Sequence, residues 1–277
     1  MLIKIEGVLV NPNYNCVVLQ RGLSMKAPIT VPVEELTKEP YASIVCYPRT
    51  TSSEMQRRIQ ELKQHSIEAL QFTGKTSANN IPILGKGYVG IVAIAHVKGK
   101  CYAVKMRRSD ADRENFAHEA NMLQKANLVG VGPKFVGVSK NFLLSQLIDG
   151  DLLIEWLQAH RDKVLVRRVL VDILEQCWRL DEAGLDHGEL SKAPKHLLVD
   201  KSDKPFIVDF ETASTQRNAS NVTSVCQFLF QGNSTTAKII VESLGERNRT
   251  KVVSALRSYK KNRNRDNFEE VLKVCVL

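Results

Sequence analysis

The chain has 277 residues, of which 43% are hydrophobic and 25% charged, and its formal net charge is +9. This length and apolar content are enough to bury one or two cores, which excludes a disordered chain and a small disulfide-stabilised scaffold. Charges interrupt every apolar run well before the roughly 20 residues that a membrane helix needs, so we expect a cytoplasmic protein with no membrane contact.

The first 76 residues predict a small α/β unit. Residues 3–10 and 43–47 are apolar runs typical of strands, and residues 67–72 return as a third. Met55, Ile59 and Leu62 recur at helical spacing after two serines that can cap a helix. The polar segment 73–80 contains the Gly, Ser and Asn residues that suit a boundary. No chemical motif occurs in this unit, and its role stays open.

Strands dominate the sequence from residue 77 to residue 148. Residues 81–84, 90–97 and 101–106 predict three strands, and residues 134–138 and 142–147 predict a further hairpin. A helix is expected to start near Asp112, because the apolar residues that follow share one helical face. We therefore expect an antiparallel β lobe with one helix.

Helices dominate from residue 149 to residue 277. A long buried amphipathic helix is indicated by apolar residues at helical spacing: Val166, Leu170, Ile173, Leu174 and Cys177. Two short apolar runs, residues 196–199 and 206–208, predict a small hairpin within this region. The predicted fold is α+β and two-lobed, with the lobes at residues 77–148 and 149–277 of one domain, after the small unit at residues 1–76.

Three glycines form the pattern G-x-G-x-x-G-x-V: Gly85, Gly87 and Gly90. In a dinucleotide-binding fold such glycines lie between a strand and a helix, whereas here a strand follows them. Glycines allow a backbone to fold closely over a triphosphate, with its amide hydrogens toward the phosphate oxygens. Taken alone, the pattern also fits an ordinary glycine-rich hairpin.

A lysine and a glutamate follow these glycines in an informative order. Lys105 ends Ala-Val-Lys on the next predicted strand, and Glu119 lies on the predicted helix after it. In an ATP site, such a lysine contacts the α- and β-phosphates, and the glutamate fixes its ammonium group. Each would be an ordinary surface residue if taken singly. Their order after the glycines favours an ATP site.

A second group of motifs follows the long helix. His-Gly-Glu begins at His187, and Asp-Phe-Glu begins at Asp209, directly after the second strand of the small hairpin. Together with the glycine pattern, Lys105 and Glu119, these motifs resemble the protein-kinase-like superfamily. The chain is most similar to the compact RIO kinases, the small KEOPS-complex kinase and an archaeal-type group of RIO-like Ser/Thr kinases. The resemblance covers residues 81–230.

The resemblance implies a role for each matching residue. Lys105 and Glu189 would be catalytic, with Glu189 in the place of the usual aspartate, and Asp209 would hold Mg²⁺. His196 is a candidate metal or phosphate contact, with a structural role as the alternative, and Glu211 is either a further metal ligand or an exposed acid. The implied ATP-binding residues are Gly85, Lys86, Gly87, Gly90, Val92, Ala103, Lys105, Glu119 and, at the adenine-binding hinge, Gln146 and Ile148.

Three departures from the kinase pattern keep several functions open. Glu189 replaces an aspartate, Pro194 stands where a metal-binding asparagine is usual, and no Ala-Pro-Glu follows Asp209. The resemblance implies a Ser/Thr protein kinase that uses ATP and Mg²⁺ and phosphorylates a protein acceptor or itself. The alternatives are a RIO-like ATPase switch in RNA or ribosome maturation, a nucleotide-binding pseudokinase scaffold, and a small-molecule kinase.

Basic residues are concentrated near the C-terminal end of the sequence. Eight of them occur with no acid among them: Arg247, Arg249, Lys251, Arg257, Lys260, Lys261, Arg263 and Arg265. Such a cluster suggests RNA or a ribosomal particle as partner. A solvated helix face is the alternative, and few aromatic residues are interleaved for base stacking.

Overall fold

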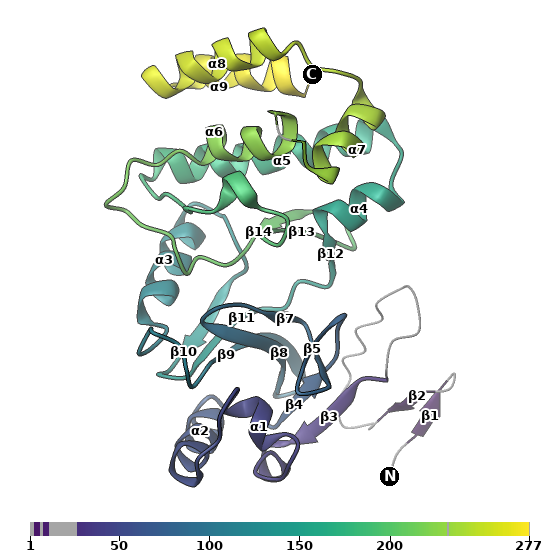
Figure 1. Ribbon diagram of the computed structural model, residues 1–277, viewed down its shortest axis with the longest axis vertical. Helices are drawn as coiled ribbons and strands as arrows, with labels where there is room; N and C mark the ends of the chain where they lie inside the picture. The colour runs from purple at the N-terminus through teal and green to yellow at the C-terminus, as the bar shows by residue number, and fades with distance from the viewer. Residues whose placement is uncertain (1–2, 6–7, 11–26, 232, 277) are drawn as a thin grey trace. The chain divides into compact units, whose positions relative to one another are not determined.

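The computed structural model describes residues 3–5, 8–10, 27–231 and 233–276. These residues form helices and antiparallel strand pairs, so the predicted α+β class is confirmed (Figure 1). The chain divides into two compact units: residues 1–120 with 134–147 form the first, and residues 121–133 with 148–277 form the second. Within the described ranges, no helix has the length and apolar character needed to cross a membrane.

The first unit contains a seven-stranded antiparallel sheet. Its strand order is β10-β11-β9-β8-β4-β3, and β7 also pairs with β8. The strands are β3 (Ile29–Pro32), β4 (Ala69–Phe72), β7 (Gly85–Lys86), β8 (Gly90–Val97), β9 (Lys100–Arg107), β10 (Phe135–Val138) and β11 (Phe142–Gln146). The strands predicted at residues 67–72, 90–97, 101–106, 134–138 and 142–147 are all present.

Among the described residues of the first unit, two further strand pairs lie outside this sheet. They are β1 (Ile3–Ile5) with β2 (Val8–Val10), and β5 (Thr76–Ala78) with β6 (Ile81–Ile83). The strand predicted at residues 81–84 corresponds to β6. The single strand predicted over residues 3–10 is wrong, because residues 3–5 and 8–10 are two strands that pair antiparallel with each other. Residues 6 and 7 between them lie outside the described residues.

The large sheet continues across the boundary that the sequence predicts near residue 76. Strand β4 pairs with β8, and Leu70 lies opposite Ala95. Leu70, Phe72 and Ala95 are completely buried in one hydrophobic cluster, which also contains Ile44 from the segment before β4. Residues 29–72 and the strands after them therefore share a core, because the apolar side chains of β4 cover the same face of the sheet as those of β8.

Two helices, α1 (Ala42–Val45) and α2 (Ser52–Gln64), lie together beside β3 and β4 (Figure 1). The strand predicted at residues 43–47 is wrong, because α1 occupies this segment. Its three consecutive buried residues, Ile44, Val45 and Cys46, do not alternate between two faces as a half-buried strand requires. Helix α2 is confirmed, and Thr51 caps it rather than the two serines, because its side chain accepts the Glu54 amide.

Helix α3 (Ala117–Leu128) starts five residues later than the sequence predicts. The side chain of Asn115 accepts the Ala117 amide at 2.8 Å. Phe116, which lies just before the helix, is buried with Val89, Ala120 and Leu143 in a second small cluster of the first unit. A polar cap close to the first helical residue thus sets the start of α3.

The second unit combines a three-stranded antiparallel sheet with helices. The sheet order is β12-β13-β14, formed by β12 (Gly150–Leu152), β13 (Leu197–Asp200) and β14 (Pro205–Ile207). The helices are α4 (Leu153–Ala159), α5 (Lys163–Glu182), α6 (Asn221–Cys226), α7 (Thr235–Leu244), α8 (Arg249–Lys261) and α9 (Arg265–Cys275), with short turns at Leu190–Lys192 and Gln227–Gln231. The predicted hairpin and the long helix α5 are confirmed, and all five apolar residues that predict α5 are buried.

Candidate functional site

The glycine-rich pattern forms the tight hairpin between β7 and β8. Gly85 lies opposite Val92 in the strand pairing, and the Gly87 amide donates a hydrogen bond of 2.8 Å to the Gly90 carbonyl oxygen. Tyr88 at the tip is 92% exposed. The strand-to-strand setting predicted for the glycines is therefore present. We call residues 85–90 the glycine loop.

The three glycines differ in what the fold requires of them. A Cβ atom at Gly90 would lie 2.8 Å from the Met106 carbonyl oxygen on the neighbouring strand β9, which is too close. The nearest atom to a Cβ atom would lie at 3.9 Å for Gly85 and at 3.7 Å for Gly87, and both distances are ordinary van der Waals contacts. The sheet thus explains Gly90, whereas packing explains neither Gly85 nor Gly87.

Lys105 and Glu119 meet within the first unit. The Lys105 Nζ lies 3.0 Å from both carboxylate oxygens of Glu119. Both side chains are nearly buried, with 12% and 6% of their surfaces exposed. Strand β9 holds the lysine and the first turn of α3 holds the glutamate. The structure therefore brings together two residues that are 14 positions apart in the sequence and lie on different elements.

The remaining predicted ATP-binding residues of the first unit lie on the same sheet. Val92 on β8 pairs with Lys105, and Ala103 on β9 lies beside β11. Gln146 ends β11, and its amide donates to the Lys134 carbonyl oxygen at 2.8 Å. This amide is thus engaged within the first unit. Ile148 follows as the first residue of the long second-unit segment.

In the second unit, the imidazole of His196 lies between two carboxylates. Its Nε2 is 3.2 Å from Oε2 of Glu189, and its Nδ1 is 3.9 Å from Oδ2 of Asp209. Glu189 directly precedes the short turn Leu190–Lys192, His196 directly precedes β13, and Asp209 lies two residues after β14. The three predicted site residues of this unit are therefore neighbours.

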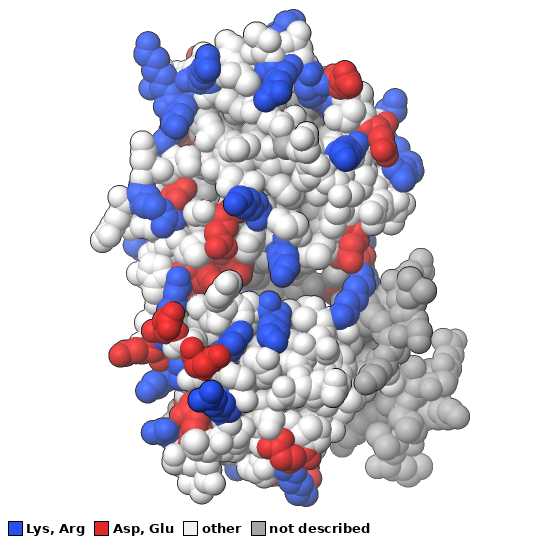
Figure 2. Space-filling view, viewed as in Figure 1, with Lys and Arg blue, Asp and Glu red and all other residues white. Residues whose placement is uncertain are grey.

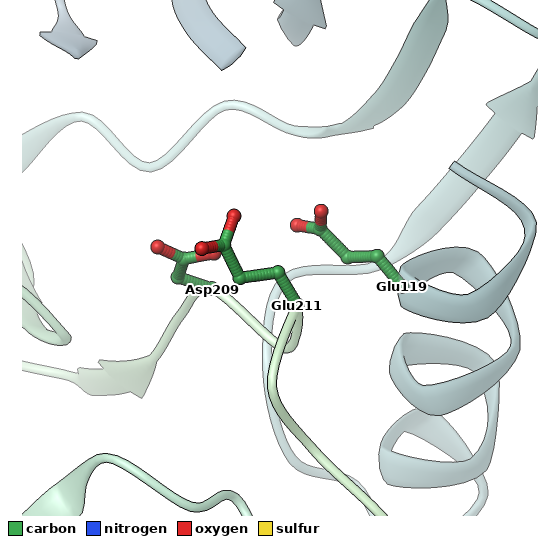
Figure 3. Close-up of side chains that lie close together, drawn as sticks. All are labelled: Glu119, Asp209 and Glu211. Atoms are coloured by element: carbon green, nitrogen blue, oxygen red, sulfur yellow. The ribbon is translucent and has the colours of Figure 1, made fainter. Parts of the chain in front are cut away.

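Asp209 has an unusual backbone conformation. Its φ is +70°, in the left-handed region that residues other than glycine seldom adopt. Such a conformation persists only where the surrounding structure enforces it, and it is frequent at functional sites. Figure 3 shows Asp209 and Glu211 on the segment after β14, and it shows Glu119 on α3.

Asp209 and Glu211 can each offer one oxygen within 4.8 Å of the other. Carboxylate oxygens are the ligands that Mg²⁺ prefers, and one or two of them commonly hold this ion beside phosphate groups. The donor chemistry and the spacing thus fit a magnesium ion.

His187 is completely buried beneath this group of residues. Its Nε2 lies 3.0 Å from the Val208 carbonyl oxygen, and burial lowers the pKa of its imidazole to about 4. The ring is therefore neutral near pH 7, with the proton on Nε2. The His187 amide donates to Oδ1 of Asn221, and the Thr212 hydroxyl donates to the His187 carbonyl oxygen. These contacts hold the segment that carries Glu189.

Several supporting residues carry no signal in the sequence. Gly188 has a φ of +90°, and a Cβ atom there would lie 2.5 Å from Nη2 of Arg217, whose Nε pairs with Asp186 at 2.8 Å. Asn221 and Arg217 lie more than 25 residues after the motifs that they support, in a segment without a recognisable pattern. Only contacts in the folded chain identify them.

The C-terminal basic residues divide into two groups. Five on α8 are exposed: Arg249, Lys251, Arg257, Lys260 and Lys261. The other three make polar contacts: Arg247 with the Cys275 carbonyl oxygen, Arg263 with Asn218, and Arg265 with Glu175 and Glu269. Figure 2 shows blue side chains gathered over the part of the second unit where Figure 1 places α8 and α9.

Comparison with known proteins gives one relative and no family description. No protein-family model matches the chain. An 83-residue stretch is 34% identical to "Uncharacterized protein MJ1211" of Methanocaldococcus jannaschii. The matched stretch makes up 30% of this chain and 69% of the archaeal protein. The name of this relative gives no activity.

Proposed function

Since the chain belongs to the same family as protein MJ1211 of Methanocaldococcus jannaschii, whose name assigns no activity, we propose a function from the chain's own residues. The chain is an atypical Ser/Thr protein kinase of the protein-kinase-like superfamily, and it acts in the cytoplasm. It transfers the γ-phosphate of Mg·ATP to a hydroxyl of a protein acceptor or of itself. In this proposal the first unit is the β lobe and the second unit is the helical lobe of a kinase-like fold.

The ion pair between Lys105 and Glu119 carries the proposal. Both carboxylate oxygens of Glu119 lie 3.0 Å from the ammonium group, and little of either side chain is exposed. Burying two charges is costly, so a pair of this kind needs a compensating role. A fixed ammonium group that contacts the α- and β-phosphates of ATP is such a role, because transfer depends on holding the nucleotide still.

The glycine loop gives separate support. Gly85 and Gly87 leave room for a side chain in the fold as it stands. Packing within the fold therefore does not require glycine at these two positions, so such a requirement would come from a bound ligand. Close approach of phosphate groups to the backbone amides is a requirement of that kind.

Asp209 and Glu211 would hold the magnesium ion, which would supply positive charge to neutralise the phosphate groups of ATP. The left-handed backbone at Asp209 fixes the direction in which its carboxylate leaves the chain. The ring nitrogens of His196 both face carboxylates, which favours a role in orienting Glu189 over direct contact with the metal.

Glu189 would accept the proton of the acceptor hydroxyl. Its Oε2 lies 3.2 Å from Nε2 of His196, and this contact restricts a side chain that is one methylene longer than aspartate. A carboxylate within hydrogen-bond reach of the attacking hydroxyl is the usual base in phosphoryl transfer from ATP. The remaining catalysis is positioning and neutralisation of phosphate charge.

A transfer assay tests this proposal. The purified chain, incubated with Mg²⁺ and γ-labelled ATP, should label itself or a generic protein acceptor, and Asp209→Asn and Glu189→Gln should both abolish the label. Asp200→Asn, on strand β13 of the same unit, is the matched control and should keep activity. Transfer that persists in Asp209→Asn would refute the assigned site. ATP binding by the wild type without transfer or hydrolysis would favour the pseudokinase scaffold.

The exposed basic residues of α8 favour a second candidate function. An ATPase switch in RNA or ribosome maturation would use them to contact phosphate groups of RNA. RNA binding should then weaken steeply with salt, and replacing Lys260 and Lys261 by Gln should reduce that salt dependence. Lys273→Gln on α9 is the control. RNA binding that is absent, or equal in both variants, would remove this candidate.

A further inference from the structure

Tyr47, in the segment after α1, contacts the glycine loop. The ammonium group of Lys86, which lies between Gly85 and Gly87, donates a hydrogen bond of 2.6 Å to the Tyr47 hydroxyl oxygen. The same Nζ lies 4.6 Å from the centre of the tyrosine ring. Both residues belong to the first unit.

Arg108 contacts the same ring and the same loop. Its Cζ lies 5.4 Å from the centre of the Tyr47 ring, a distance at which a cation is attracted to the π face. The Arg108 amide donates to the Val89 carbonyl oxygen at 2.8 Å, and its Nη1 donates to the Gly87 carbonyl oxygen at 3.3 Å. Asp110 accepts two further hydrogen bonds from the guanidinium and so orients it. Tyr47 thus lies against two cations, one within the loop and one bonded to it.

The segment that carries Tyr47 is itself fixed to the end of β9. The Ser109 amide donates to the Tyr47 carbonyl oxygen at 2.7 Å, and the Ser109 hydroxyl accepts the Arg49 amide at 3.2 Å. One guanidinium nitrogen of Arg58, on α2, donates to the carbonyl oxygens of Val45 and Arg107, each at 2.6 Å. Helix α2 therefore ties the segment before Tyr47 to the strand that carries Lys105.

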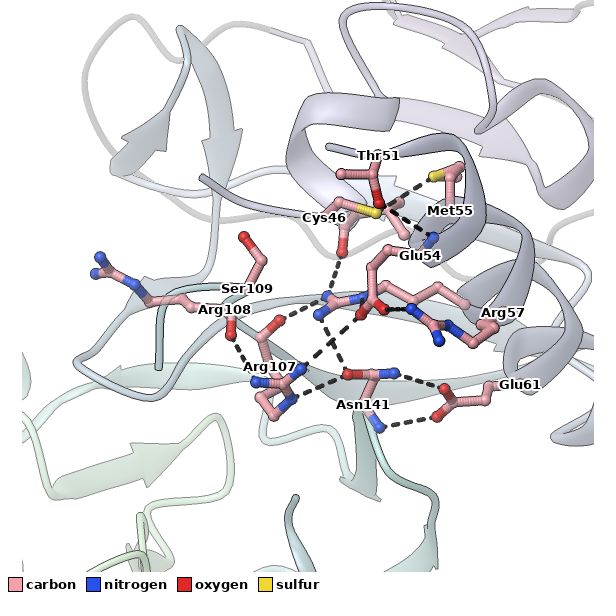
Figure 4. Close-up of polar contacts among 12 residues, drawn as sticks. Cys46, Thr51, Glu54, Met55, Arg57, Glu61, Arg107, Arg108, Ser109 and Asn141 are labelled. Atoms are coloured by element: carbon pink, nitrogen blue, oxygen red, sulfur yellow. Dashed lines mark hydrogen bonds and ion pairs between the residues drawn. The ribbon is translucent and has the colours of Figure 1, made fainter. Parts of the chain in front are cut away.

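Arg58 is completely buried, so its charge depends on these partners. Its Nε pairs with Glu54 at 2.8 Å, and its Nη2 donates to Oδ1 of Asn141. Asn141 in turn donates to Glu61 through its backbone and side chain. Figure 4 shows this group of polar contacts, which joins α2 to β9 and to the turn before β11. A network with every member paired holds its elements rigidly.

We infer that Tyr47 is a positioning residue for the glycine loop, and that residues 42–64 serve as its rigid support. The Tyr47 hydroxyl holds the Lys86 ammonium beside the loop, and the ring holds the Arg108 side chain that bonds the Gly87 carbonyl. The arrangement restricts the loop before any ligand binds. A restricted loop loses less conformational freedom when it closes over the phosphates of ATP, so Tyr47 should favour ATP binding. This part of the inference rests on the proposed function.

Hydrogen exchange of the loop amides tests the inference without nucleotide. In Tyr47→Phe, which keeps the ring and removes only the hydroxyl, the amides of residues 85–90 should exchange roughly two to ten times faster than in the wild type, as expected for loss of one hydrogen bond. Tyr41→Phe is the matched control, because its ring stacks on Phe72 at 5.8 Å, and it should leave the loop unchanged. Equal exchange in Tyr47→Phe and the wild type would overturn the inference.

A double-mutant cycle separates positioning from a general structural effect. In a Lys86→Met background, Tyr47→Phe should no longer change loop exchange, because the donor of the hydrogen bond is already gone. An undiminished effect of Tyr47→Phe in that background would contradict the assigned contact. The melting temperature of Tyr47→Phe should stay close to that of the wild type.

ATP measurements distinguish failure of the inference from failure of the proposed function. If both hold, Tyr47→Phe should raise KM for ATP roughly two to ten times, by the same hydrogen-bond argument, and leave kcat nearly unchanged. Faster loop exchange in Tyr47→Phe together with no ATP binding by the wild type would retain the positioning role and reject the kinase proposal. Altered ATP affinity with unchanged loop exchange would reject the positioning role alone.

Discussion

The hydroxyl of Tyr259 on α8 donates a hydrogen bond of 2.8 Å to Oδ2 of Asp181 on α5. Oδ1 of the same carboxylate accepts the backbone and side-chain N–H groups of Asn221. Asn221 then accepts the amide of His187, in the segment that carries Glu189. All four residues are buried. A continuous set of hydrogen bonds thus joins the basic helix to the proposed catalytic segment.

This network predicts a stability loss in Tyr259→Phe. The variant removes one of the donors to a buried carboxylate, so we expect the free energy of unfolding to fall by about 1 to 3 kcal/mol. Urea denaturation measures the change. The same substitution at the half-buried Tyr102 on β9 should have a smaller effect. Equal losses in both variants would show that the Asp181 contact is not special.

The burial of His187 predicts a pH-dependent stability. Burial lowers the pKa of His187 to about 4, so between that value and the ordinary pKa of histidine the unfolded chain binds more protons. The contribution of His187 to the free energy of unfolding is therefore fully present above about pH 6.5 and is lost as the pH falls toward 4. We expect a loss of roughly 1 to 2 kcal/mol between pH 6.5 and pH 5.

Unfolding curves of the wild type and His187→Gln across this pH range measure the effect. The glutamine amide can still donate to the Val208 carbonyl oxygen, but it does not titrate. The free energy of unfolding should therefore depend less on pH in His187→Gln than in the wild type. An unchanged slope in His187→Gln would contradict the buried neutral imidazole.

Alanine at the three glycines should separate folding from binding. Gly90→Ala places a Cβ atom 2.8 Å from the Met106 carbonyl oxygen, so it should cost about 1 to 3 kcal/mol of stability. Gly85→Ala and Gly87→Ala should fold with nearly unchanged melting temperatures and bind ATP more weakly. Gly87→Ala that binds ATP like the wild type would remove the support that the glycine loop gives to the proposed function.

The contacts of His196 predict which kinetic constant it controls. If His196 orients Glu189, then His196→Gln should lower kcat about 10- to 100-fold, the usual effect of a group that positions an active-site residue. The Mg²⁺ concentration needed for half-maximal activity should stay the same. A large increase in that concentration would instead identify His196 as a metal ligand, which is one of the roles that the sequence leaves open.

Periodicity and turn residues predict most strands and the helices α2 and α5, because these elements bury one regular face. The segment at residues 43–47 is predicted wrongly, since Ile44, Val45 and Cys46 are apolar in any conformation and are all buried around a single helical turn. The pairing of β4 with β8 is also not predictable, because the polar segment 73–80 between them looks like a domain boundary. Which strands pair with each other depends on contacts between strands that are far apart in the sequence, and local sequence does not specify these contacts.

The sequence predicts those parts of the candidate site whose residues follow one another along the chain in a recognisable order. The glycine loop, Lys105, Glu119 and Asp209 are found from that order, and the structure adds the contact that joins Lys105 to Glu119. The contact of Tyr47 with Lys86 could not be found, because 39 residues separate them and Tyr47 lies in no motif. Supporting residues of this kind are set by packing between distant segments.

Binding of Mg·ATP by Lys105→Met tests the central claim most directly. Calorimetric titration should show that the wild type binds Mg·ATP and that Lys105→Met binds it at least about ten times more weakly, as expected when a charged hydrogen bond to phosphate is lost. Lys100→Met, at the start of the same strand, should bind like the wild type. No binding by the wild type, or equal binding by Lys105→Met and Lys100→Met, would contradict an ATP site built on the Lys105 and Glu119 pair.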